Sequence, residues 1–393
     1  MPPTPSSPDQ MPAARRRAVR RRRRRIVLVA GAPALLVGVA LATMLHVLAY
    51  SPAAPRPSER LARDAADRFL ERYVEGDGRV VRRDQGGDTV SEGQAYALLL
   101  AVAVDDPGRF DQVWTWTREH LQRGDGLLAW RWRDGRVVDQ SPASDADVDT
   151  AQALSLAAER FGVPAYREAS IRIARSVLAS ETVKAPAGLV LVAGPWARSP
   201  SIVNPSYFSP AGFAALAATT GDRRWSALAS SSHRLVSALT AHRPGLPPDW
   251  ARLAGDVLQP IGAPDDPRGQ PSYGFDAARL VVRLAADCSP GGRQLASQTR
   301  RLLPPAGEPV MAVYDLHGRP LVGYEHPVGT VAAAAAAQTD GDSDAARRLL
   351  DHAQALDERN PTYYGAAWVA LGRLLLTTGL LDGCRPAPGG ASS

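Results

Sequence analysis

Apolar residues recur at helical spacing along most of the chain. Eleven segments place apolar side chains at positions i, i+3, i+4 and i+7, as helices that bury one face do. These segments are 58–74, 93–104, 107–121, 148–162, 164–180, 209–221, 222–242, 275–287, 328–337, 344–358 and 361–379. Only 189–194 and 309–315 read as strands. The pattern predicts eleven or twelve helices and an all-α fold.

The helical segments do not repeat one sequence motif at a fixed period, which argues against a solenoid of identical units. Their number fits a ring of helix pairs in which inner and outer helices alternate. In such a ring, a chemical site is expected at one mouth, where loops meet the ends of the inner helices.

The chain begins with a segment of a different character. Residues 1–25 contain nine arginines and one acid, and residues 26–49 contain no charged side chain. At helical rise, 24 residues span about 36 Å, enough to cross a hydrocarbon core of about 30 Å. We therefore expect a transmembrane signal anchor at 26–50, a cytoplasmic tail at 1–25 and an extracytoplasmic domain. A cleaved signal peptide is the alternative.

A Pro-rich linker is expected at 51–58, followed by one large domain at 59–384 and a flexible tail at 385–393. Apolar residues make up 45% of the chain, so the domain can bury a large core. The net charge is +6, the tail contributes 9 − 1 = +8, and the remainder sums to 6 − 8 = −2. A nearly neutral domain gives no reason to expect a nucleic-acid partner. Whether Cys288 and Cys384 pair stays open.

Acidic residues stand at three points where a loop is expected to lead into a helix. The first is Glu92, which follows Ser91, a residue suited to cap the helix. An acid in a first turn is common because it interacts favourably with the helix dipole. Here Gly86, Gly87 and Gly93 also keep side-chain bulk away, which favours close approach of a substrate. A carboxyl at the head of a buried helix can keep its proton near neutral pH.

In the second group, Asp145, Asp147 and Asp149 alternate just before a helix. Calcium loops show such alternation, but they need a glycine after the third acid, where this chain has Thr150. A calcium site is therefore not expected. Capping of the helix by Ser144 or Asp145, with surplus surface charge, is the structural alternative.

The third group is Asp276 with Arg279, three residues apart and so on one face of a helix. The arginine can orient the carboxylate and hold it ionised. An ordinary surface ion pair is the alternative, and it would contribute well under about 1 kcal/mol.

Aromatic residues accompany these acids. Trp130 and Trp132 are expected on the same side of an extended segment, and Tyr207 and Trp250 lie in loops further along. Flat rings near carboxylates suit a sugar-binding cleft, because sugar rings stack on them while acids bind the hydroxyls. The chain contains no metal-ligand set, phosphate-binding loop or G-x-S-x-G elbow, so neither a metal nor a cofactor is expected.

Several of these segments together resemble glycoside hydrolase family 8, which includes bacterial endoglucanases, chitosanases and xylanases. In chain order they are SEGQAYAL, DGLLAWRW, ASDADVDTAQAL, NPSYFSP, PPDW, YGFDAAR and PTYYGAAWVALGRLLL. The resemblance covers about residues 60 to 382. It implies an (α/α)6 barrel and hydrolysis of β-1,4 glycosidic bonds with inversion.

The resemblance also implies roles for the acids. Glu92 matches the general acid, and Asp276 matches the base that activates water, with Arg279 as its partner. Asp145 matches the acid that binds and helps distort the sugar at the cleavage point. An inverting reaction needs this combination, because a protonated acid serves the leaving oxygen while an ionised base activates water on the opposite face.

Four further residues are expected to bind substrate. Tyr207 and Trp132 match positions that contact the sugar or the attacking water, and Trp130 and Asp147 are expected beside them. Phe275 departs from the family pattern, which has tyrosine before the base, so a hydroxyl group is missing there.

The chain is therefore expected to be a membrane-anchored, extracytoplasmic endo-β-1,4-glucanase that acts on β-1,4-linked polysaccharide. A chitosanase or xylanase of the same family is one alternative. The other is a non-catalytic glycan-binding module that assists a cell-surface polysaccharide synthase.

Overall fold

Twelve α-helices make up most of the described chain. The computed structural model describes residues 56–241, 245–266, 268–287 and 289–381. Its helices are α2 Pro57–Tyr73, α3 Ser91–Val104, α4 Pro107–His120, α5 Ser144–Phe161, α6 Pro164–Ser180, α7 Pro210–Thr220, α8 Arg224–Ala241, α9 Phe275–Ala285, α10 Pro290–Gln298, α11 Pro327–Thr339, α12 Ser343–Arg359 and α13 Tyr363–Thr377.

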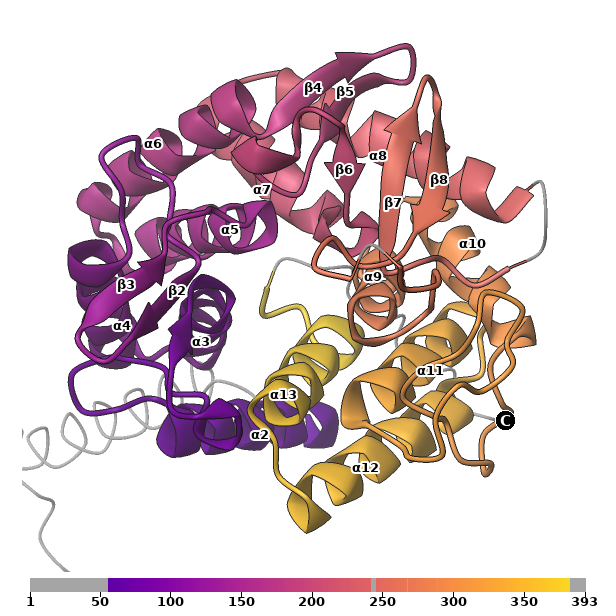
Figure 1. Cartoon of the computed structure of the whole chain (residues 1–393). Coiled ribbons are helices and arrows are strands. Elements are labelled where there is room, and N and C mark those ends of the chain that lie inside the picture. Colours follow the sequence, from indigo (N-terminus) through magenta and orange to yellow (C-terminus); the bar gives the residue numbers. More distant parts are fainter. Residues whose placement is uncertain (1–55, 242–244, 267, 288, 382–393) are drawn as a thin grey trace, which may run out of the picture. The chain divides into compact units, whose positions relative to one another are not determined.

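The helices form a closed ring of inner and outer members (Figure 1). Each inner helix contacts the next in the order α3, α5, α7, α9, α11 and α13, and α13 contacts α3 to complete the circle. The outer helices α2, α4, α6, α8, α10 and α12 pack against them from outside. The predicted (α/α)6 barrel is confirmed.

Sequence explains which helices lie inside. In α3, 12 of the 14 residues are buried, so this helix is apolar almost all round. The alanine run Ala332–Ala337 in α11 is likewise buried, and its small side chains allow neighbouring helices to approach closely. Outer helices such as α2 and α12 bury a single stripe and expose charged residues. Helices with two buried sides therefore make up the inner ring.

Eight short strands form three antiparallel sheets among the described residues. They are β1 Thr89–Val90, β2 Arg131–Arg133, β3 Arg136–Asp139, β4 Thr182–Ala185, β5 Gly188–Leu191, β6 Ile202–Val203, β7 Trp250–Ala254 and β8 Val257–Ile261. The sheets have the orders β1-β2-β3, β4-β5 and β6-β7-β8. The expected strand at 189–194 overlaps β5. The one expected at 309–315 is wrong, because this segment makes only isolated bridges such as Tyr314 to Tyr273.

Several predictions concern residues outside the described ranges. These are the tail 1–25, the anchor 26–50, Cys288, Cys384 and the tail 385–393. Among the residues that are described, no helix combines the length and the apolar character that crossing a bilayer requires. Helix α2 begins at Pro57, so the last two residues of the expected linker at 51–58 are helical.

Candidate active site

Four inner helices begin at the same mouth of the ring and bring polar side chains there. Glu92 lies in the first turn of α3, Asp145 in that of α5 and Asp276 in that of α9. Tyr363 and Tyr364 open α13. Residues that are far apart in sequence thus meet because each stands at the head of an inner helix.

Arg279 joins the three acids. Its Nη1 lies 2.8 Å from Asp145 Oδ2 and 3.7 Å from Glu92 Oε2, and its Nη2 lies 2.5 Å from Asp276 Oδ1. Nη1 also donates a hydrogen bond to the Tyr96 hydroxyl at 3.0 Å. The side chain is 1% exposed, so these contacts take place away from bulk water. The structure therefore brings the three predicted acids together around one buried cation.

Glu92 has the environment of a proton donor. Burial raises its pKa to about 7, and the nearby negative charges of Asp145 and Asp276 act in the same direction, while Arg279 opposes them. The Tyr363 hydroxyl donates to Glu92 Oε1 at 3.4 Å. With 21% of its side chain exposed, Glu92 can hold a proton near neutral pH and still reach a ligand.

Asp276 differs from Glu92 in its partner and its exposure. One of its oxygens accepts directly from Arg279, which gives the carboxylate a cationic partner. The side chain is 28% exposed and lines a pocket of about 200 Å³, together with Trp250 and Phe275. A carboxylate at the edge of an open pocket can accept a proton from a bound water.

Asp145 and Asp147 lie in different surroundings although they are two residues apart. Asp145 faces Arg279 and is 2% exposed. Asp147 is fully buried, and its Oδ1 accepts from the backbone N–H of Leu128. The buried acid Glu181 interacts with Asp147, and burial raises the pKa of both Asp147 and Glu181. The side chain of Asp147 has no exposed surface, so the structure does not place it among the residues that face the mouth, and its substrate-binding role stays a prediction.

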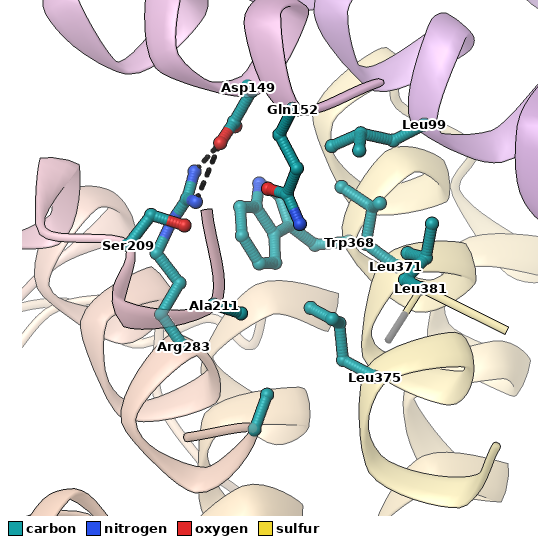
Figure 2. Close-up of a pocket in the computed structure, with 11 residues that line it drawn as sticks. Leu99, Asp149, Gln152, Ser209, Ala211, Arg283, Trp368, Leu371, Leu375 and Leu381 are labelled. Carbon is teal, nitrogen blue, oxygen red and sulfur yellow. Dashed lines mark hydrogen bonds and ion pairs between the residues drawn. The ribbon is translucent and has the colours of Figure 1, made fainter. Parts of the chain in front are cut away.

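Asp149 repeats the Asp145 arrangement one helical turn deeper in the barrel. Arg283, one turn beyond Arg279, pairs with Asp149 at 2.8 and 2.7 Å, as the dashed lines in Figure 2 show. The pair lines a cavity of about 30 Å³ with Trp368 and Gln152. The barrel interior thus has two layers of acid–arginine pairs, and only the upper one meets the mouth.

The aromatic residues are placed unequally. Tyr207 covers Arg279, whose guanidinium carbon lies 5.4 Å from the ring centroid, and Trp250 meets Tyr207 edge-on at 6.1 Å. Trp130 packs against the main core, whereas Trp132 packs with Trp116 in a separate cluster. Where β2 pairs with β3, Val138 of β3 is an extra residue opposite Arg131 and Trp132, so β3 carries a bulge there. The presentation of both tryptophans to a sugar stays a prediction.

Local details at the head of α3 also differ from the expectation. The N-cap is Val90, and the Ser91 hydroxyl is buried without a partner among the described residues. Helix α5 likewise begins without a side-chain cap, and the Ser144 hydroxyl bonds to Val192 O. A β-carbon added to Gly93 would lie 2.8 Å from the Tyr363 hydroxyl. Gly93 therefore makes room for Tyr363, which contacts Glu92. The expectation was that this glycine makes room for a substrate.

Sequence reasoning missed four residues of the site: Tyr96, Asp249, Tyr363 and Tyr364. Tyr96 follows Glu92 by one helical turn, so helical spacing contained a signal for it. Tyr364 donates from its hydroxyl to the backbone oxygen of Phe275 at 3.1 Å, and no local pattern in the sequence indicates that contact.

An (α/α)6 barrel that gathers a carboxyl of raised pKa, an arginine-bound carboxylate and aromatic rings at one mouth has the groups that a glycoside hydrolase needs. Residues 38–264 match the family Glycosyl hydrolases family 8. The chain belongs to this family.

Relatives of known name support the assignment. The chain is 32% identical over 313 residues to "Probable endoglucanase" of Novacetimonas hansenii, a match that covers 77% of this chain and 87% of that protein. It is 31% identical over 231 residues to "Endoglucanase" of Cellulomonas uda, covering 57% of this chain and 63% of that protein, less than two thirds of its length.

Solved structures agree in fold. The endo-beta-1,4-glucanase CMCax from Acetobacter xylinum gives a TM-score of 0.68 at 28% identity, covering 81% of this chain and 98% of that one. Endoglucanase Cel10 from Klebsiella pneumoniae gives 0.67 at 26% identity, covering 79% and 98%.

Proposed function

We propose that this chain is an inverting endo-β-1,4-glucanase in which Glu92 is the general acid and Asp276 the general base. The observation that carries the proposal is the shared cation: three carboxyls surround Arg279, and one of them, Glu92, has a pKa of about 7. The similarity to a probable endoglucanase and to an endo-beta-1,4-glucanase supports β-1,4-glucan as the substrate.

Charge balance supports this division of roles. Arg279 carries one positive charge, so ionised Asp145 and Asp276 already leave the group at −1. Ionising Glu92 as well would place a second uncompensated negative charge in a largely buried site, which is unfavourable. Burial raises the pKa of Asp145 as well, but Arg279 Nη1 lies 2.8 Å from Asp145 and 3.7 Å from Glu92, so the cation favours the charged form of Asp145 more strongly. We therefore assign the proton to Glu92.

The reaction follows from these protonation states. Glu92 donates its proton to the glycosidic oxygen as that bond breaks, and Asp276 takes a proton from the water that attacks the anomeric carbon on the opposite face. Asp145 Oδ1 is buried and has no partner among the described residues. In the proposed complex it accepts a hydroxyl group of the sugar at the cleavage point, which satisfies this oxygen. Tyr207 and Trp250 supply ring faces for neighbouring sugars.

The location of the enzyme is a further part of the proposal. The arginine-rich segment followed by 24 uncharged residues at 26–49 supports a single-pass anchor, with the catalytic domain on the outer side of the membrane. A site held there would meet glucan delivered by a cell-surface polysaccharide synthase, the partner we propose. Extraction of the full-length protein from membranes by detergent but not by alkaline carbonate is the expected result. Release by carbonate would contradict the anchor.

Substrate profiling tests the activity. The full-length protein should release reducing sugar from carboxymethylcellulose and lichenan faster than from xylan or chitosan, and NMR should show the α-anomer as the first product. Glu92→Gln and Asp276→Asn serve as matched inactive controls. Preference for xylan or chitosan would favour the other activities of the family, and glucan binding without product would favour a glycan-binding module.

A further inference from the structure

Asp249 ties the start of β7 to the head of α9, the helix that carries Asp276. Its Oδ1 accepts hydrogen bonds from the backbone N–H of Gly274 at 3.0 Å and of Ala277 at 2.7 Å. Its Oδ2 accepts from the Ser272 hydroxyl at 3.1 Å, and its own N–H donates to Ser272 O at 2.8 Å. Three hydrogen bonds to the carboxyl and one from the backbone thus hold Asp249 against the turn that leads into α9.

The contact to Ala277 replaces a cap that the helix itself lacks. The N-cap of α9 is Gly274, which has no side chain to satisfy the free N–H groups of the first turn. A β-carbon on Gly274 would lie 2.7 Å from Asp249 Oδ2, so glycine leaves the space that the carboxyl occupies. Asp249 therefore acts as an N-cap supplied from 28 residues away.

The two bonded amides stand on either side of Asp276 in the chain. Asp249 and Asp276 line the same pocket of about 200 Å³. Burial, and after it the negative charge of Asp276, raises the pKa of Asp249 to about 7. On its other side, Asp276 is attracted by Arg279. Repulsion from one side and attraction from the other favour a single orientation of the Asp276 carboxylate.

We propose that Asp249 is a positioning residue for the base: by capping α9 on both sides of Asp276, it fixes where that carboxylate stands relative to the attacking water. This inference rests on the function proposed above. Asp249 takes no part in the proton transfer to the leaving group, and it acts on the reaction only through Asp276.

A helix cap that merely stabilises the fold is the competing explanation, and the chain offers a matched control for it. Asp342 caps α12 by accepting from the Ala345 N–H at 2.9 Å, and α12 belongs to the outer ring. Asp342→Ala removes the same kind of hydrogen bond without touching the site.

The experiment compares Asp249→Ala, Asp249→Asn, Ser272→Ala and Asp342→Ala in the full-length protein on a soluble neutral β-1,4-glucan. A 1 Å misplacement of a reacting group can reduce a rate by about 100-fold, so Asp249→Ala should lower kcat at least about tenfold with KM within about twofold. Asp249→Asn keeps the Oδ1 acceptor and should keep kcat within about threefold of the wild type. Ser272→Ala removes one of the bonds to the Asp249 carboxyl and should lower kcat less than Asp249→Ala does. Asp342→Ala should leave kcat unchanged.

A second measurement assigns the defect to the base side. An aryl cellobioside with a dinitrophenolate leaving group needs no general acid, so it should restore turnover to Glu92→Gln but not to Asp249→Ala. Equal kcat in Asp249→Ala and Asp342→Ala would overturn the proposal, as would restoration of Asp249→Ala by the activated substrate. If the wild type fails to hydrolyse any glucan, the proposed function itself fails. That result differs from the two results for Asp249→Ala, which would overturn only its positioning role.

Discussion

Raising the pH through 7 should switch off hydrolysis, because Glu92 then loses the proton that it must donate. The environment of Glu92 raises its pKa from 4.5 to about 7, which favours the neutral carboxyl by roughly 3 kcal/mol relative to water. With that pKa, about one tenth of the molecules hold the proton at pH 8 and about one hundredth at pH 9. The rate constant kcat/KM should fall in the same proportion.

The same shift in pKa makes stability depend on pH. The folded pKa of Glu92 lies above its unfolded value of 4.5, so this contribution is complete below pH 4.5 and is lost as the pH rises towards 7. Within that window, the free energy of unfolding should fall by up to about 1.4 kcal/mol per pH unit. Glu92→Gln cannot ionise, so the variant should be inactive and yet lose less stability than the wild type between pH 5 and 8.

Two assays test this reasoning on the same samples. Initial rates on a soluble neutral glucan from pH 4 to 9 give the alkaline limb of kcat/KM, and thermal unfolding over the same range gives the stability slope. A rate that stays flat to pH 8.5, or parallel stability curves for the wild type and Glu92→Gln, would refute the assignment of the titrating group.

Three further predictions address other parts of the molecule. Asp276→Asn should lower kcat by about 10²- to 10⁴-fold with an unchanged circular dichroism spectrum and Tm, and near-normal turnover would remove this residue from the mechanism. Glu181→Gln should reduce the loss of Tm above pH 5, because burial raises the pKa of Glu181 and the charged form opposes folding; the exposed Glu159→Gln is the control, and equal curves would contradict the prediction. Gly93→Ala should displace the Tyr363 hydroxyl and lower kcat several-fold with little change in Tm, whereas wild-type kcat would show that Tyr363 is dispensable.

The periodicity of apolar residues predicted the helices that bury a continuous stripe, but it predicted few of the other elements. All eleven expected segments became helices, but α10 was not expected, because its sequence PGGRQLASQ combines two glycines with polar residues. The hairpins β2-β3 and β7-β8 were also missed, since their strands have three to five residues and show weak alternation. Closure of the ring depends on contacts between distant helices, which the local pattern does not encode.

The acidic group at the head of α5 shows why part of the site escaped prediction. The helix begins at Ser144, so the three aspartates already lie on helical turns. Residues two apart on a helix point to nearly opposite sides, whereas residues four apart share a face. Asp145 and Asp149 therefore face Arg279 and Arg283, while Asp147 turns towards Leu128. The predicted helix began at residue 148, so Asp145 and Asp147 were expected before it and were not assigned to different helix faces.

Helical periodicity and local motifs could not predict which distant residues contact each other in the site. Tyr363 and Glu92 are 271 positions apart, and Asp249 reaches Ala277 across a hairpin and a loop. Such contacts follow from how the ring closes.

The packing of α13 against α2 and α3 has a consequence for how the enzyme is made. Since α13, the last helix of the described residues, packs against α2 and α3 and closes the ring, the barrel stays open until the ribosome has synthesised nearly the whole domain. Until then the apolar sides of α3 and α11 lack some of their partners, a state prone to aggregation and slow to mature. Hydrolytic competence should accordingly arise late and all at once, so nascent or truncated chains are inert towards glucan.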